Sequence, residues 1–256
     1  MRLSVSKFWE GAAVGLLLQS GAEASPVTQL NVAYNTGSDF VVSIHGPVEE
    51  NVYATAFQVS YVGGQAMPGG NNNPFIGFCV DIEATLKPNS YWQATPFGSI
   101  VPADEGYVTA SGMFRAENLY QAFAGQVNWN NQSGGAAGGA LQLAIWDVLY
   151  GTDLNRVDDA ASSFYVTPAS IPGYGNLATY QAMVAQANAW LATAANSPLA
   201  PLLGSTFWQT TDADGNPTTD NQDLIGPTGF VPEPATFLAG LLAGSYLVWH
   251  TIRRRG

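Results

Sequence analysis

The stretch A-L-Q-L-A-I-W-D-V-L-Y-G, at residues 140–151, predicts a buried helix that carries one polar amide in an apolar face. Gln142 follows a pair of glycines by one turn and precedes Ile145 and Trp146 by one turn, so its neighbours at helical spacing are small or apolar. Burying an amide without partners costs roughly 2 to 7 kcal/mol. The sequence therefore predicts either hydrogen-bond partners for Gln142 or a reaction that removes its amide nitrogen.

A nucleophile for such a reaction stands in the segment F-C-V-D, at residues 78–81, which holds the one cysteine of the chain. Apolar and polar residues alternate along residues 76–86, which predicts a strand with Cys79 on its polar face. A cysteine that only fills space is expected on the apolar face, because free cysteine behaves as a small hydrophobe. The pattern indicates a thiol placed for chemistry; the alternative is a reduced, idle Cys79 beside a Gln142 bonded to backbone.

The pair F-C at residues 78–79, followed by L-Q-L-A-I-W at residues 141–146, resembles the thioester domains of bacterial surface adhesins. That resemblance implies that the sulfur of Cys79 joins the side-chain carbonyl of Gln142 with loss of ammonia, and that an amine on a surface or matrix partner later opens the bond. Such chemistry is used once, so we expect neither an enzyme nor a cofactor. The side chains expected to shield the bond from water are Phe78, Ile145 and Trp146.

Length and composition indicate one acidic domain. The chain has 256 residues, of which 46% are hydrophobic and 11% charged, which is enough for one sizeable core. Residues 25–232 contain 16 acidic residues against only Lys87, Arg115 and Arg156, so nucleic acid is not an expected partner. A single cysteine excludes an intramolecular disulfide, and an unpaired thiol is unusual in an oxidising compartment.

The N-terminal 24 residues are typical of a secretory signal. Arg2 and Lys7 form a basic start, residues 11–18 an apolar run, and A-E-A at residues 22–24 a small-x-small cleavage site. Export is therefore expected, with a mature extracytoplasmic domain over residues 25–226.

The expected fold class of that domain is α+β, with an antiparallel β-rich part followed by a helical part that closes over it. Helices are expected over residues 116–127, around Gln142 and over residues 176–195, with Gly151 ending the second and Asp147 solvated. A late strand pair around residues 214–222 is expected to return to the sheet. The earlier strands are predicted at residues 29–34, 39–45, 52–62, 75–86 and 91–100.

Two further motifs suggest other chemistry. Asp212, Asp214, Asn216 and Asp223 fall at positions 1, 3, 5 and 12 of a calcium-loop pattern, but the required glycine is displaced, so a hairpin turn is the preferred interpretation and no metal is expected. His45 is the one histidine of residues 25–232, and a structural role is expected for it.

The C-terminal segment has three parts in a fixed order. The motif Val231-Pro232-Glu233-Pro234, within a linker over residues 227–234, precedes an apolar run over residues 235–252. At 1.5 Å per residue that run spans about 27 Å, which is enough for a membrane helix. The basic end consists of Arg253, Arg254 and Arg255, which favours a cytoplasmic C-terminus.

This order resembles the PEP-CTERM sorting signal of Gram-negative bacteria. The resemblance implies anchoring of residues 235–256 in the inner membrane, cleavage near Pro-Glu-Pro by an exosortase, and transfer to the cell surface or extracellular matrix. A plain single-span anchor is the alternative for the tail. For the domain two alternatives stay open: a non-covalent matrix or glycan-binding protein with an idle thiol, and a hydrolase that uses Cys79 with His45.

Overall fold

A computed structural model of the chain describes residues 27–34, 40–62, 74–82, 84–87, 90–95, 110–127, 132–151, 156–170, 177–195, 205–219 and 221–227. The predicted signal peptide and the predicted sorting tail, including residues 231–234, 235–252 and 253–255, lie outside these residues. Within the described ranges, no helix is both long and apolar enough to cross a membrane. The strands are β1 (Val27–Tyr34), β2 (Phe40–His45), β3 (Glu50–Ala54), β4 (Phe57–Tyr61), β5 (Phe75–Cys79), β6 (Ser90–Thr95), β7 (Tyr165–Pro168), β8 (Ser205–Thr211) and β9 (Leu224–Pro227). The helices are α1 (Ala110–Phe123), the short 3-10 helix η2 (Ala124–Gln126), α2 (Gln132–Tyr150) and α3 (Leu177–Ala195).

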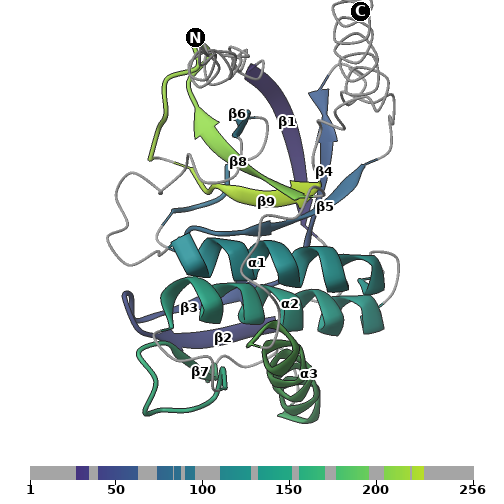
Figure 1. Cartoon of the computed structure of the whole chain (residues 1–256), viewed down its shortest axis with the longest axis vertical. Helices are drawn as coiled ribbons and strands as arrows, with labels where there is room; N and C mark the ends of the chain where they lie inside the picture. Colours follow the sequence, from purple (N-terminus) through teal and green to yellow (C-terminus); the bar gives the residue numbers. More distant parts are fainter. Residues whose placement is uncertain are drawn as a thin grey trace, which may run out of the picture.

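These elements form three layers (Figure 1). A closed antiparallel barrel, in the order β1-β4-β5-β9-β8-β6, lies on one side of the helices α1 and α2. A three-stranded sheet, in the order β3-β2-β7, lies on the other side, and α3 packs against α2. Antiparallel strands together with three α-helices confirm the predicted α+β class.

The chain crosses between the two sheets inside the segment that was predicted as one strand over residues 52–62. β3 ends in the three-stranded sheet at Ala54, and β4 begins in the barrel at Phe57. Thr55 and Ala56, both buried, connect them. The single-strand prediction is therefore wrong, because a run of strand-forming residues without glycine or proline does not distinguish one strand from two strands that join different sheets.

Two glycines let α2 lie directly on this crossing. A Cβ atom on Gly138 would stand 3.0 Å from Cβ of Ala56, and one on Gly139 would stand 2.8 Å from the carbonyl oxygen of Ala54. Both distances are shorter than an ordinary van der Waals contact, so only glycine permits this approach. The glycines thereby allow α2 to lie close to this crossing, one turn before Gln142.

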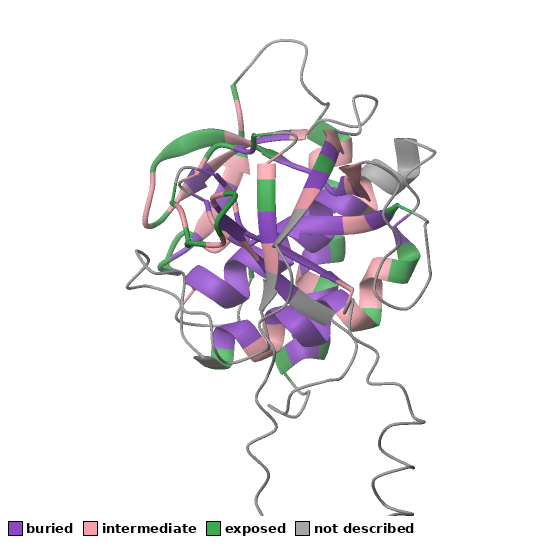
Figure 2. Ribbon diagram, turned by 90° about the horizontal axis from the view of Figure 1, so that it is seen from above, coloured by how far each residue is buried: buried purple, intermediate pink, exposed green. Residues whose placement is uncertain are grey.

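Helix α2 is the centre of the core. Every residue from 138 to 150 is buried. Figure 2 shows that buried residues fill the interior of the molecule and that exposed residues lie at its periphery. A helix that is apolar on all sides is expected to be enclosed by other elements. Asp147 is also buried, at 0% exposure, so the prediction that it is solvated is wrong. The helix ends at Tyr150, and the N–H of Gly151 donates to the carbonyl of Asp147, as predicted for the C-terminal glycine.

The remaining differences concern faces and ends of elements. The helix predicted over residues 176–195 is α3, in which Val184, Ala187 and Leu191 are buried but Leu177 is 60% exposed. The late strand pair exists as β8 and β9, which flank residues 212–223 instead of occupying them. β7 was not predicted, because a four-residue strand carries too little periodicity to be recognised.

Candidate functional site

The structure brings Cys79 and Gln142 together across 63 residues of sequence. The N–H of Cys79 donates to Oε1 of Gln142 over 2.9 Å, and Nε2 of Gln142 donates to the carbonyl oxygen of Cys79 over 2.7 Å. Cys79 is 1% exposed and Gln142 is 0% exposed. The hydrogen-bond partners of Gln142, which the helix sequence alone does not identify, are therefore the main-chain N–H and carbonyl of Cys79.

The strand register explains why these main-chain groups are available. β4 pairs with β5 through Phe57 and Gly77, and β4 begins at Phe57, so it does not extend to a position opposite Cys79. The next residue, Val80, donates its N–H in the other direction, to the carbonyl of Asp223. Main-chain groups alternate in direction along a strand. The amide of Gln142 therefore takes the place that a neighbouring strand would occupy beside Cys79.

The thiol of Cys79 points to the other side of the strand from α1. The ring of Phe78 packs edge-on against Tyr120 of α1, with centroids 6.1 Å apart, and side chains alternate along a strand. Sγ of Cys79 donates a hydrogen bond to Oε1 of Gln222, just before β9. The predicted polar face of this strand is wrong: both faces of β5 are covered, one by a helix and the other within the barrel.

A short segment over residues 221–223 lies against the thiol and is tied down along its length. Asn221 accepts the N–H of Lys87 through its side chain and the hydroxyl of Thr210 through its carbonyl. The carbonyl of Gln222 accepts the indole N–H of Trp92 over 3.1 Å. The segment thus has a fixed main chain, from which the side chain of Gln222 reaches the sulfur.

The surroundings of the sulfur keep the thiol protonated. Burial raises the pKa of Cys79 well above its ordinary value, and the negative charges of Asp81 and Asp223 raise it further. Burial also raises the pKa of Asp223 to about 7, although the N–H and hydroxyl of Thr210 donate to its carboxylate and lower it. At neutral pH the site holds a neutral thiol beside a partly protonated carboxyl group.

A tyrosine fixes the chain beyond the cysteine. The hydroxyl of Tyr150, at the end of α2, donates to the carbonyl of Val80 over 2.7 Å and accepts the N–H of Ile82 over 3.4 Å. Helix α2 therefore holds this stretch at two points, through Gln142 and Tyr150. The three residues predicted to shield the pair, Phe78, Ile145 and Trp146, are all buried in the core.

Sequence reasoning missed Gln222 and Tyr150. Gln222 lies 143 residues from Cys79, and no spacing pattern connects the two. Tyr150 stands in the helix that sequence reasoning did identify, two turns after Gln142 and therefore near its face. That helical spacing was the one available signal for it.

His45 lies far from the sulfur in the architecture. It ends β2 in the three-stranded sheet, while Cys79 ends β5 in the barrel, and the helical layer separates the two sheets (Figure 1). Its Nδ1 lies 2.7 Å from Oε2 of Glu49, its Nε2 lies 3.1 Å from Oγ1 of Thr167, and its ring stacks on Tyr165. The structure does not bring Cys79 and His45 together as a hydrolase pair.

The calcium-like motif forms a turn. Oδ1 of Asp212 accepts the N–H groups of Asp214 and Asn216, Oδ2 of Asp212 accepts the side-chain amide of Asn216, and Gly215 has a φ of 87°. Asp223 does not join this turn, because it is buried and bound by Thr210. The four residues of the motif are therefore not assembled as one ligand set.

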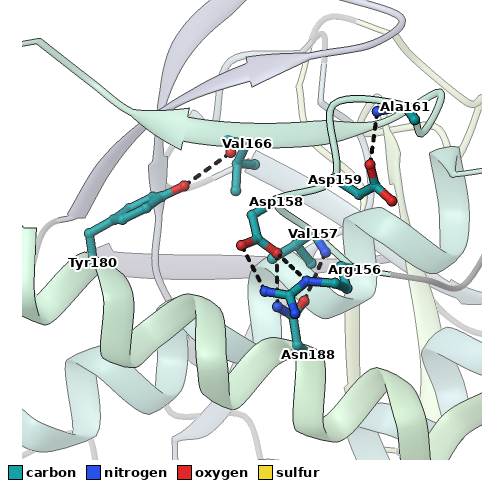
Figure 3. A network of polar contacts seen from close by, with 8 residues as sticks. All are labelled: Arg156, Val157, Asp158, Asp159, Ala161, Val166, Tyr180 and Asn188. Carbon is teal, nitrogen blue, oxygen red and sulfur yellow. Dashed lines mark hydrogen bonds and ion pairs between the residues drawn. The ribbon is translucent and has the colours of Figure 1, made fainter.

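A second polar cluster joins the loop before β7 to α3 (Figure 3). Asn188 of α3 accepts the N–H of Val157 over 2.9 Å and donates to Asp158 over 2.9 Å. Arg156 pairs with the same carboxylate, and its charge and hydrogen bonds lower the pKa of Asp158. The hydroxyl of Tyr180 donates to the carbonyl of Val166, which ties α3 to β7. We assign this cluster a structural role.

Comparisons of the chain with protein-family models, with curated proteins and with solved structures found no match.

Proposed function

We propose that this chain is an exported surface or matrix protein that forms an internal thioester between Cys79 and Gln142 and uses it to attach covalently to an amine-bearing partner. The observation that carries the proposal is the bidentate hydrogen bonding between these two residues inside a buried site. The side-chain amide of Gln142 and the main chain of Cys79, from segments 63 residues apart, are held next to one another by these bonds. Fixed orientation of this kind can supply roughly 7 to 11 kcal/mol of a barrier in the best cases.

The arrangement also orients the amide for attack. Main-chain hydrogen bonds lie in the plane of a sheet, whereas side chains project from its faces. The amide of Gln142 binds the main chain of Cys79 and therefore lies in the plane of the sheet, whereas the thiol of Cys79 projects from its face. We infer that rotation about the Cα–Cβ bond of Cys79 would bring the sulfur toward the face of the amide carbon. The N–H of Cys79 polarises the carbonyl by donating to Oε1, as oxyanion-stabilising donors do.

The proposed reactions balance as follows. The Sγ–Cδ bond forms, the Cδ–Nε2 bond of Gln142 breaks, and ammonia leaves with the proton of the thiol. Later, the nitrogen of a primary amine on the partner bonds to Cδ, the Sγ–Cδ bond breaks, and the sulfur takes up a proton released by the amine. Each molecule reacts once, so the chain is not proposed to be an enzyme, and no cofactor takes part.

The proposed route to the surface rests on the sequence. A signal over residues 1–24 would direct export, and residues 235–256 would hold the chain in the inner membrane. An exosortase would cut near Val231, Pro232, Glu233 and Pro234 and release the domain to the cell surface or matrix of a Gram-negative bacterium. The motif order, with Arg253, Arg254 and Arg255 at its end, supports this proposal.

A second function is supported by the same hydrogen bonds. The amide of Gln142 is satisfied by Cys79, and the thiol is satisfied by Gln222, so the site is also complete as a purely structural contact. In that case the protein would be a non-covalent matrix or glycan-binding protein with an idle thiol.

Methylamine labelling separates the two functions. The purified chain is incubated with isotopically labelled methylamine, digested, and mapped by mass spectrometry. The covalent function predicts label on residue 142 together with a newly alkylatable Cys79, and no label in Cys79→Ala. Absence of label from residue 142, with Cys79 alkylated in urea before any methylamine treatment, would exclude the covalent function.

A further inference from the structure

The thiol of Cys79 is buried, and one of the side chains in contact with it is partly exposed to solvent. Cys79, Gln142, Asn221 and Asp223 are buried, whereas Gln222, which touches the sulfur, is half-buried. Among the described residues bonded to the side chain or main chain of Cys79, Gln222 is the one with part of its surface in water. Gln222 is therefore the described partner of the sulfur that also meets solvent.

The main chain around that side chain is fixed. The carbonyl of Gln222 is held by Trp92, the carbonyl of Asp223 accepts the N–H of Val80 over 3.0 Å, and the side chain of Asn221 accepts the N–H of Lys87 over 2.6 Å. By contrast, the side chain of Gln222 is bound to a thiol, and a thiol is a weak hydrogen-bond donor. Rotation of this side chain is thus the smallest movement that uncovers the sulfur.

The other half-buried residue close to the thiol is engaged elsewhere. Asp81 follows Cys79 by two residues, and its Oδ1 accepts the N–H of Ala84 over 3.1 Å, which turns the carboxylate into its own loop. Its charge nevertheless acts on Cys79, as the raised pKa of the thiol indicates. A protonated amine that approached along Gln222 would enter a negatively charged region.

We propose that the side chain of Gln222 is the removable cover of the Cys79 thiol, and that water and the partner amine reach the Cys79–Gln142 pair by the path that it closes. The second half of this inference rests on the proposed thioester. The first half does not, because a free thiol at Cys79 would be covered in the same way.

The test measures access to the sulfur in the purified full chain. Wild type, Gln222→Ala, Gln222→Met and Gln58→Ala are treated with methylamine, which leaves Cys79 as a thiol whether or not a thioester was present. The rate of alkylation by iodoacetamide is then followed by mass spectrometry from pH 7 to pH 10. Gln58, half-buried on β4 of the same barrel, is the matched control.

A cover that is open in only a small fraction of molecules slows alkylation by that fraction, so Gln222→Ala should alkylate about tenfold faster or more at each pH of the series. Gln222→Met, which keeps the volume of the cover, and Gln58→Ala should stay close to the wild-type rate. Equal alkylation rates for Gln222→Ala and wild type at every pH, with equal melting temperatures, would overturn the cover. A faster Gln222→Ala in a chain whose wild type never incorporates methylamine would keep the cover and remove the thioester.

Discussion

The side-chain amide of Gln142 binds both main-chain polar groups of Cys79, through contacts of 2.9 Å and 2.7 Å, and so completes the end of a strand from within a helix. This relationship joins the central helix to the barrel at the one cysteine of the chain. The amide of Gln142 is a hydrogen-bond partner of Cys79, and in the proposed thioester reaction it would also be the acyl donor.

The hydrogen-bonding role predicts a loss of stability that does not depend on any thioester. In a Cys79→Ala chain the main-chain groups remain but no thioester can form, so adding Gln142→Ala leaves a buried N–H and a buried carbonyl without partners. Each such group costs about 1 to 3 kcal/mol, so the free energy of unfolding should fall by about 2 to 6 kcal/mol in urea titrations. Adding Gln58→Ala instead should change it by less than about 0.5 kcal/mol. Equal effects of the two substitutions would show that the amide contacts contribute nothing.

Because α2 lies close to the crossing between β3 and β4, adding a methyl group at Gly139 should destabilise the fold more than adding one at Gly125. Gly139→Ala places a Cβ atom 2.8 Å from the carbonyl oxygen of Ala54 and 2.5 Å from Sδ of Met183, so α2 must shift. Overpacking of this kind should lower the free energy of unfolding by about 1 to 3 kcal/mol. Gly125→Ala is the control, because nothing lies within 4 Å of its added Cβ. If thermal unfolding shows the same midpoint for both variants, α2 does not depend on this contact.

The buried carboxyl of Asp223 predicts how stability depends on pH. Its pKa rises from 3.8 to about 7 on folding, so between about pH 4 and pH 7 the folded chain binds the proton that the unfolded chain has lost. Stability from this group is therefore present at low pH and declines by up to about 4 kcal/mol as the pH rises through that window. Asp223→Asn keeps an oxygen acceptor for Thr210 and removes the charge.

In urea titrations Asp223→Asn should therefore be more stable than wild type at pH 8 and close to it at pH 5. Removing the same charge also eases ionisation of the thiol, so the pKa of Cys79, read from alkylation rates, should fall. A variant that is less stable than wild type at both pH values would contradict a destabilising negative charge on Asp223.

The cluster in Figure 3 predicts that Asn188 holds the loop before β7. Asn188→Ala leaves the N–H of the buried Val157 without its partner, which should cost about 1 to 3 kcal/mol in urea unfolding. The exposed Gln186, on the same helix, is the control, and Gln186→Ala should be within about 0.5 kcal/mol of wild type. A loss confined to Gln186→Ala would contradict the assigned role.

The sequence predicts the proximity of Cys79 and Gln142 and the fold class better than it predicts the environment of these two residues. The amide of Gln142 is visible because it interrupts an apolar helix, and helical spacing is a local signal. The burial of Cys79 on both faces is not visible, because barrel closure and Gln222 are contributed by segments far away in the chain. Asp147 was misassigned for a related reason: α2 is enclosed on every side, so its polar residue is buried as well.

The measurement that tests the thioester most directly is the intact mass of the untreated, unreduced chain, compared with Cys79→Ala and with the sequence mass calculated from the N-terminus that is found. The account predicts a wild type that is lighter than its sequence by one ammonia, resists thiol alkylation, and regains reactivity after methylamine. Cys79→Ala should have its full mass. A wild type with its full sequence mass, whose Cys79 is alkylated in urea without any methylamine treatment, would contradict the account and leave Gln142 as a structural amide.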